Sequence, residues 1–195
     1  MSDLPPDHEA WGLLHDLRLR GLVEESGHEH TDLLVEIGFV VRKRTYLAVT
    51  PEGRERHAAW VRLADDAPEY AAVHRAYEAF LPLNAELIRL CSDWQVRPGN
   101  VPNDHSDLRY DWGVVDRLRA LDERAGGVVR RLARSVPRFA AYRARLHDSL
   151  RKLEDGDNDW FTSPRIDSYH TVWMHMHEDL LATLGLRRED EEPAS

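Results

Sequence analysis

Apolar residues recur at three- and four-residue steps along almost all of the 195 residues of this chain. This spacing is typical of amphipathic helices that bury one face. A different pattern appears only in residues 39–42 and 45–49, which are rich in β-branched and aromatic residues and flank a basic turn. Such segments favour strands. The sequence therefore predicts a mainly α protein with one small β-hairpin.

Residues with cap and turn preferences divide the helical pattern into segments. We expect a first helix marked by Trp11, Leu14 and Leu17, a very short second segment from Leu22 to Ser26, and a third helix from about Thr31 to Gly38. Thr50 and Pro51 have the residue types of an N-cap and a first helical position. The later helices, bounded by Pro68, Pro82 and Pro137, are expected over residues 51–65, 68–81, 83–95, 107–125, 127–136, 137–154 and 167–185.

These segments predict two domains and a tail. Residues 1–66 combine the first helices with the hairpin, residues 67–186 form an all-helical domain, and residues 187–195 are an acidic tail. Within the helical domain, residues 96–106 and 155–166 lack helical periodicity. Long loops of mixed aromatic and polar composition are often functional, so these two loops are the first place to look for a site.

The balance of charge and cysteine limits the possible functions. The formal net charge is −9, and residues 1–60 hold seven Lys or Arg against eleven Asp or Glu, which leaves −4 there. An acidic chain repels phosphate, so any contact with nucleic acid needs a local basic patch. Cys91 is the only cysteine, which excludes disulfides within the chain and zinc sites built from cysteine. Because no apolar run is long enough for a membrane span and no signal peptide opens the chain, we expect a cytoplasmic protein without a membrane partner.

The first sixty residues resemble a known family of regulators. Three helices followed by a two-stranded hairpin is the element order of a winged helix-turn-helix domain. The run Gly38-Phe39-Val40-Val41, the basic turn, and the run from Leu47 to Arg54 are similar to the wing of MarR-like regulators, over about residues 8–60. The helical domain resembles one that accompanies such wings in actinobacterial proteins of unknown activity.

The resemblance implies a DNA-binding transcriptional regulator with a helical domain that responds to a small molecule. It also implies a homodimer, for which the helices expected at 51–81 and 167–185 would supply the surface. The residues that it places at DNA are His30, Thr31, Arg42, Lys43 and Arg44.

The segment that would read DNA has an unusual composition for that role. Residues 28–37 hold three carboxylates, Glu29, Asp32 and Glu36, and no Arg or Lys. Recognition helices normally present polar or basic side chains to bases and phosphates. The alternative hypothesis is therefore an enzyme or a small-ligand-binding protein on a winged-helix scaffold that no longer binds DNA.

Aromatic, acidic and histidine side chains gather in and around the two long loops. A concave site with aromatic walls and a few polar groups is what a small organic ligand needs. We expect the loops and the last helix to converge on such a pocket, lined by Trp94, Asp104, His105, Asp107, Trp160, Arg165, Tyr169 and Trp173.

The last helix carries the candidates for acid–base chemistry. Asp167, His170, Met174 and His177 follow three- and four-residue steps and share one face. If the protein is an enzyme, His170 or His177 is the expected acid or base, with Asp167 beside it. The alternative is that these histidines form hydrogen bonds between packed helices.

Metal and cofactor motifs do not fit the sequence. His170 and His177 are about 10 Å apart along a helix axis, which is long for one tetrahedral ion. Residues 155–166 begin like a calcium loop, but Trp160 stands where glycine is needed and Ile166 where a bidentate glutamate is needed. P-loop, dinucleotide-binding and nucleophile-elbow motifs are absent from the sequence. We therefore expect no metal and no cofactor.

Overall fold

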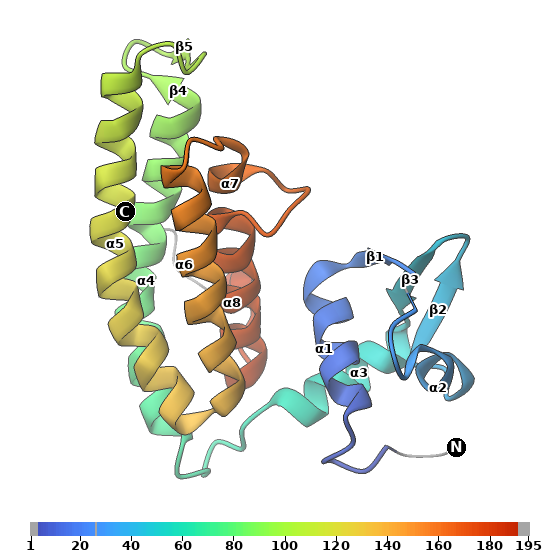
Figure 1. The fold of residues 1–195 in the computed structure, drawn as a ribbon. Helices are drawn as coiled ribbons and strands as arrows, with labels where there is room; N and C mark the ends of the chain where they lie inside the picture. The colour runs from blue at the N-terminus through green and yellow to red at the C-terminus, as the bar shows by residue number, and fades with distance from the viewer. Residues whose placement is uncertain (1–3, 26, 191–195) are drawn as a thin grey trace. The chain divides into compact units, whose positions relative to one another are not determined.

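The computed structural model describes residues 4–25 and 27–190 and is mainly helical, with 66% helix and 8% strand (Figure 1). This confirms the prediction of a mainly α fold. The contacts divide the chain into two compact units, Met1–Leu63 with Leu181–Asp190, and a helical unit that includes Ala64–Leu180. None of the helices formed by the described residues combines the length and the apolar character that a membrane crossing needs.

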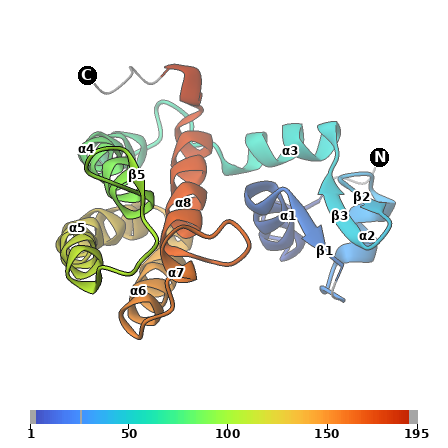
Figure 2. The same cartoon turned by 90° about the horizontal axis from the view of Figure 1, so that it is seen from above.

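The N-terminal unit contains short helices and a small antiparallel sheet (Figures 1 and 2). Its elements are α1 (Ala10–Arg20), β1 (Leu22–Glu24), α2 (Thr31–Glu36), β2 (Val40–Lys43), β3 (Tyr46–Val49) and α3 (Pro51–Val61). The strand order is β1-β3-β2, and both neighbouring pairs are antiparallel. The predicted hairpin is thus present as β2 and β3.

The segment after α1 differs from the prediction. The very short second segment expected from Leu22 to Ser26 is strand β1 over Leu22–Glu24, which pairs with β3; Ser26 lies outside the described residues. Gly21, with a φ of 81°, ends α1, and β3 offers a backbone edge that completes the hydrogen bonds of the next residues. Among the described residues, two helices rather than three therefore precede the hairpin.

The junction between β3 and α3 explains why Thr50 and Gly53 occupy their positions. The Gly53 amide donates a hydrogen bond to Thr50 Oγ1 at 3.0 Å, which caps the first turn of α3 as predicted. A Cβ atom at Gly53 would overlap the Phe39 carbonyl oxygen. The start of α3 therefore passes so close to the strand that only glycine fits.

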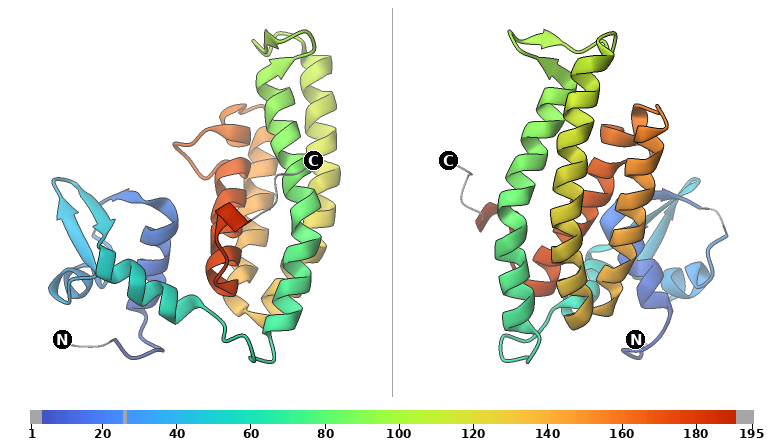
Figure 3. Two further views of the ribbon diagram at one scale, coloured as in Figure 1. Left: turned by 180° about the vertical axis from the view of Figure 1, so that it is seen from behind. Right: turned by 60° about the vertical axis from the view of Figure 1, so that its left-hand side comes forward.

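The helical unit is built from α4, α5, α6 and most of α8, which lie side by side (Figure 3). Its elements are α4 (Tyr70–Gln95), β4 (Val96–Arg97), β5 (Val101–Pro102), α5 (Leu108–Ser135), η1 (Pro137–Phe139), α6 (Ala140–Glu154), α7 (Asp159–Thr162) and α8 (Tyr169–Leu184). Arg188–Asp190 of the predicted tail form a short 3₁₀ helix, η2, and residues 191–195 lie outside the described residues.

Two predicted helix breaks are wrong. The helices expected at 68–81 and 83–95 are one helix, α4, with Pro82 inside it, and those expected at 107–125 and 127–136 are the single helix α5. Proline and glycine weaken a helix locally. In α4, however, buried residues on both sides of Pro82, among them Phe80 and Leu83, pack into the core, and this tertiary packing outweighs one missing hydrogen bond.

The prediction of an all-helical second domain is also wrong in one detail. Val96–Arg97 and Val101–Pro102 pair as a small antiparallel ribbon, β4–β5. Gly99 and Asn100 both have positive φ, at 86° and 61°, which reverses the chain tightly. The Pro98-Gly99-Asn100 run is the sequence signal for this turn.

Buried carboxylates in the helical unit are bound by arginine and tyrosine from neighbouring elements. Asp179 on α8 is 0% exposed and accepts hydrogen bonds from Arg138 Nη2 at 2.9 Å and from Tyr142 Oη at 3.1 Å. Burial, with the Asp179 carboxylate next to it, raises the pKa of Tyr142 above its ordinary value. This tyrosine therefore stays a hydrogen-bond donor.

Asp122 on α5 is held in the same way. It accepts from Arg143 Nη1 on α6 at 2.7 Å and from Tyr169 Oη on α8 at 3.1 Å, and these bonds connect three helices. Burial and the Asp122 carboxylate raise the pKa of Tyr169 well above its ordinary value.

We predict that Arg138→Ala lowers the free energy of unfolding by about 3 kcal/mol, because it leaves the buried Asp179 carboxylate without its guanidinium. Urea denaturation followed by circular dichroism measures the change. The matched control is Arg151→Ala, which breaks exposed ion pairs on α6 and is expected to cost at most about 1 kcal/mol. Equal losses in the two variants would contradict the prediction.

Candidate ligand-binding site

The loop after β5 is fixed by one buried carboxylate, Asp111, in the first turn of α5. Asn103 Nδ2 donates to Asp111 Oδ1 at 2.7 Å and to the Trp94 carbonyl oxygen at 3.0 Å. His105 Nδ1 lies 3.0 Å from Asp111 Oδ2. Asp111 therefore ties the loop to the start of α5 and orients the imidazole of His105.

The two long loops meet at Trp94. Its ring centroid lies 4.5 Å from that of His105, in the loop after β5, and 5.1 Å from that of Phe161, on α7. Because His105 has a φ of 60°, the loop turns sharply at this residue. Side chains from residues 96–106 and 155–166 are thus brought to one place in the helical unit.

A cleft of about 700 Å³ lies between these loops, which is a volume that suits a small organic ligand. We call it the loop cleft. It is lined by Trp94, Gln95, Asn103, His105, Asn158, Asp159, Thr162, Ser163, Pro164, Arg165 and Ile166. The two loops therefore converge on a cleft, and three of the predicted pocket residues, Trp94, His105 and Arg165, line it.

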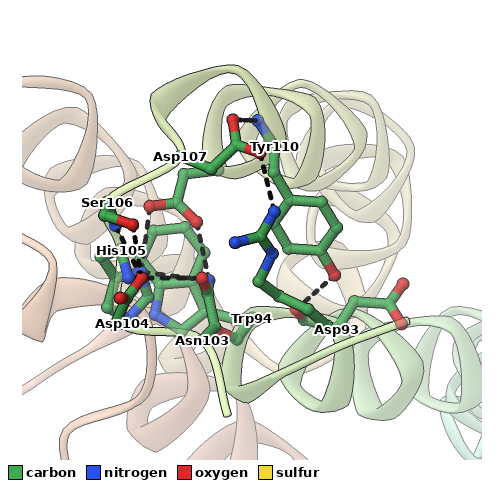
Figure 4. A network of polar contacts seen from close by, with 10 residues as sticks. Asp93, Trp94, Asn103, Asp104, His105, Ser106, Asp107 and Tyr110 are labelled. Atoms are coloured by element: carbon green, nitrogen blue, oxygen red, sulfur yellow. Dashed lines mark hydrogen bonds and ion pairs between the residues drawn. The ribbon is translucent and has the colours of Figure 1, made fainter. Parts of the chain in front are cut away.

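The two predicted loop carboxylates lie outside the loop cleft. Asp104 accepts hydrogen bonds from the Ser106 hydroxyl and amide, which lower its pKa (Figure 4). Asp107 caps α5 by accepting from the Tyr110 amide and pairs with Arg97 at 2.8 Å. Both therefore have local structural partners.

Asp107 lines a second, separate groove of about 550 Å³ at the junction of α4 and α5. The other residues of this groove are Asp93, Pro98, Arg109, Tyr110, Gly113, Val114 and Arg117.

The other predicted aromatic residues do not line the loop cleft. Trp160 donates to Asp157 Oδ2 at 3.0 Å and lies under Lys152 Nζ, 3.6 Å from the ring centroid. Tyr169 and Trp173 are fully buried, and Trp173 Nε1 donates to Asn84 Oδ1 at 3.0 Å. Tyr169 and Trp173 thus belong to the core between the helices.

The face of α8 predicted for acid–base chemistry does not line the loop cleft either. His177 is 2% exposed, and its ring centroid lies 5.0 Å from that of Phe80. Asp167 pairs with Arg145 Nη2 at 3.1 Å, and His170 is partly exposed. The same Arg145 atom lies 3.1 Å from His175 Nδ1, a contact that the sequence reasoning missed.

Among the described residues that line the loop cleft, His105 is the one histidine, and its Nδ1 lies next to Asp111. A carboxylate bound to one imidazole nitrogen fixes the orientation of the ring and leaves Nε2 as its second hydrogen-bonding atom. From the sequence, Asp167 was expected beside His170 or His177, and His105 was not paired with Asp111.

Three of the predicted DNA-binding residues, Arg42, Thr31 and His30, contact other residues of the N-terminal unit. Arg42 pairs with Asp32 and with Glu25 Oε1, the latter at 2.7 Å, and these bonds raise the pKa of Arg42. Thr31 is buried and donates to the His28 carbonyl oxygen at 2.8 Å, while His30 Nε2 lies 3.7 Å from Glu9 Oε2.

The side chains of Lys43 and Arg44 are exposed at the hairpin turn. They are therefore the predicted DNA-binding residues that remain most accessible to a phosphate.

Metal binding and catalysis by a cysteine nucleophile find little support in the described part of the chain. No group of three or more His, Cys, Asp or Glu side chains is placed there to hold a metal ion. Burial raises the pKa of the Cys91 thiol to about 12, so Cys91 is a poor nucleophile near neutral pH.

No protein-family model, curated protein or solved structure matches this chain. A functional assignment therefore rests on the geometry and chemistry of the side chains described above.

We predict that Asp111→Ala costs about 1–3 kcal/mol of unfolding free energy, because Asn103 and His105 both lose their acceptor. Urea denaturation measures the loss. Asp116→Ala, an exposed change on the same helix, is the control and should stay within about 0.5 kcal/mol. An Asp111→Ala variant as stable as this control would show that the carboxylate does not hold the loop.

Proposed function

We propose that this protein binds a small aromatic carboxylate in the loop cleft of its helical unit. The observation that carries the proposal is the convergence of Trp94, His105 and Arg165 on one cleft of about 700 Å³. Trp94 is 3% exposed and lies against His105, so the imidazole is the ring that offers contact area to a ligand. The Arg165 guanidinium would bind a carboxylate through paired hydrogen bonds.

The charged groups of the cleft narrow the class of ligand further. Arg165 is its one arginine, and Asp159 is the one carboxylate among its described lining residues. A cleft with one cation and one carboxylate favours a ligand that carries an anionic group and also a hydrogen-bond donor. Aromatic amino acids and hydroxybenzoates have this combination, and we expect binding among such compounds.

The proposal predicts that Ser163→Trp abolishes binding, because the indole would fill the cleft. We expect Arg165→Ala to weaken binding by about three- to tenfold, which is the scale of one partly solvated charge-assisted contact. Isothermal titration calorimetry with tryptophan, salicylate and related compounds measures both effects.

The control is Arg134→Ala, which removes an exposed arginine of α5 outside the cleft and should leave the affinity unchanged. Circular dichroism must show native helicity in every variant. If no compound of the panel binds the wild-type chain, or if Ser163→Trp binds as well as wild type, the proposal is wrong.

DNA binding by the N-terminal unit is a second candidate function. The antiparallel β2–β3 hairpin before α3 supports the proposal of a MarR-like winged-helix regulator, while two helices rather than three precede it among the described residues. In that case the loop cleft would be the sensing site, and the protein would act as a homodimer on a symmetric operator.

The charges around α2 make this second candidate the weaker one. Asp32 and Glu36 are exposed on α2, and Arg42 already pairs with two carboxylates. Carboxylates next to a phosphate backbone cost affinity. Contact with phosphate would therefore depend on Lys43 and Arg44.

If the second candidate is correct, Arg44→Ala should weaken binding to the upstream DNA of the protein's own gene and lower the salt slope by about 1. Fluorescence anisotropy over a series of low salt concentrations measures both quantities, with Arg134→Ala as the control. Light scattering should show a dimer. Absence of DNA binding at low salt, or a strict monomer, would exclude this model.

A further inference from the structure

One face of the β1-β3-β2 sheet carries apolar side chains that the other described elements of the N-terminal unit leave exposed. Val40, Leu47 and Val49 are buried on the face that packs in the core. The opposite face presents Leu22, Val41 and Tyr46, which are 63%, 39% and 46% exposed. Their positions follow from the register, in which Leu22 and Val41 both pair with Ala48. Adjacent exposed apolar residues of this kind are typical of an interaction surface.

This face forms part of a groove of about 700 Å³, which we call the sheet-face groove. It is lined by Leu17, Arg18, Gly21, Leu22, Val41, Lys43, Ala48, Val49, Thr50, Pro51 and Arg54. All of these residues belong to the N-terminal unit.

The ionisable side chains of the groove are all cationic. Arg18, Lys43 and Arg54 line it, and no Asp or Glu is among its described lining residues. Arg54 Nη1 also donates to the Val49 carbonyl oxygen at 2.8 Å, which holds the guanidinium at the groove. Glu24 lies on the same face of the sheet, next to Tyr46 and outside the groove.

This concentration of cations stands out because residues 1–60 carry a net charge of −4. A groove with an apolar floor and cationic walls complements a ligand that is both apolar and anionic. Complementary charge raises the rate and the specificity of such an encounter.

A second copy of this chain and duplex DNA both fit the sheet-face groove less well than an anionic, partly apolar ligand. A symmetric dimer formed through this face would place each basic groove against its own copy, and like charges would then oppose each other. The phosphates of duplex DNA could contact Arg18 and Lys43. They would make no apolar contact with the exposed Leu22 and Val41, because the DNA backbone is charged and hydrated. A peptide that carries both apolar and acidic side chains could contact the apolar floor and the basic walls at the same time.

We propose that the sheet-face groove binds an acidic peptide segment of a partner protein, with apolar side chains on the sheet and carboxylates at Arg18, Lys43 and Arg54. This binding site is independent of the loop cleft, so either can exist without the other.

The test uses the full chain and a fluorescein-labelled synthetic peptide in which glutamate alternates with leucine and phenylalanine. Fluorescence anisotropy should show saturable binding that weakens as salt rises. We expect Arg18→Ala to weaken binding by about two- to fivefold and Leu22→Thr by about three- to tenfold, because the first removes a cation and the second an apolar contact. Both side chains are exposed, so both variants should keep the native circular dichroism.

Arg44→Ala is the matched control, because it removes an exposed cation of the same hairpin that does not line the groove. It should leave peptide affinity unchanged. Peptides with lysine in place of glutamate, or serine in place of the apolar residues, should bind at least about tenfold more weakly.

Three results would overturn the proposal. The first is no saturable binding up to about 1 mM peptide. The second is an Arg44→Ala variant that weakens binding as much as Arg18→Ala and Leu22→Thr do. The third is equal binding of duplex DNA or of anionic lipid vesicles with the same dependence on Leu22, which would assign the groove to another class of partner.

Discussion

The candidate site depends on the buried Asp111 carboxylate. Its two oxygens accept from Asn103 and from His105, and the same Asn103 amide donates to the backbone of Trp94. Asn103 and His105, two loop residues that line the loop cleft, are thereby fixed relative to α4 and α5. A cleft held in this way can bind a ligand with little further loss of conformational freedom.

Carboxylates bound by arginine recur through the helical unit. Asp122 and Asp179 are each held by an arginine and a tyrosine, and Asp167 shares Arg145 with His175. The pairs of the buried Asp122 and Asp179 add less stability than apolar packing of the same volume, but removing one partner is costly. They restrict how the helices can pack, because each buried carboxylate has to lie within hydrogen-bond distance of a particular arginine.

The two units carry different kinds of surface. The loop cleft of the helical unit combines aromatic rings with one cation and one carboxylate, which suits a small ligand. The sheet-face groove of the N-terminal unit combines an exposed apolar floor with three cations, which suits an acidic peptide. Acidic side chains on α2 and the pairing of Arg42 leave few cations for DNA.

The sequence by itself determined the features that depend on neighbouring residues. Helical periodicity predicted a mainly helical chain, β-branched residues predicted the hairpin over β2 and β3, and Thr50 with Pro51 predicted the start of α3. The composition of residues 96–106 and 155–166 also pointed to the two loops that line the loop cleft. These features could be predicted because helix periodicity, strand preference and capping act over a few residues.

Only the tertiary structure decided the features that need a distant partner. Leu22–Glu24 became a strand because β3 offered an edge, and α4 continued through Pro82 because its flanks are packed. Helical spacing could not show that Trp173 and His177 face the core, since that depends on Asn84 and Phe80 of another helix. In the same way, the choice of His105 as the histidine of the cleft follows from where Asp111 lies once α5 is packed against α4.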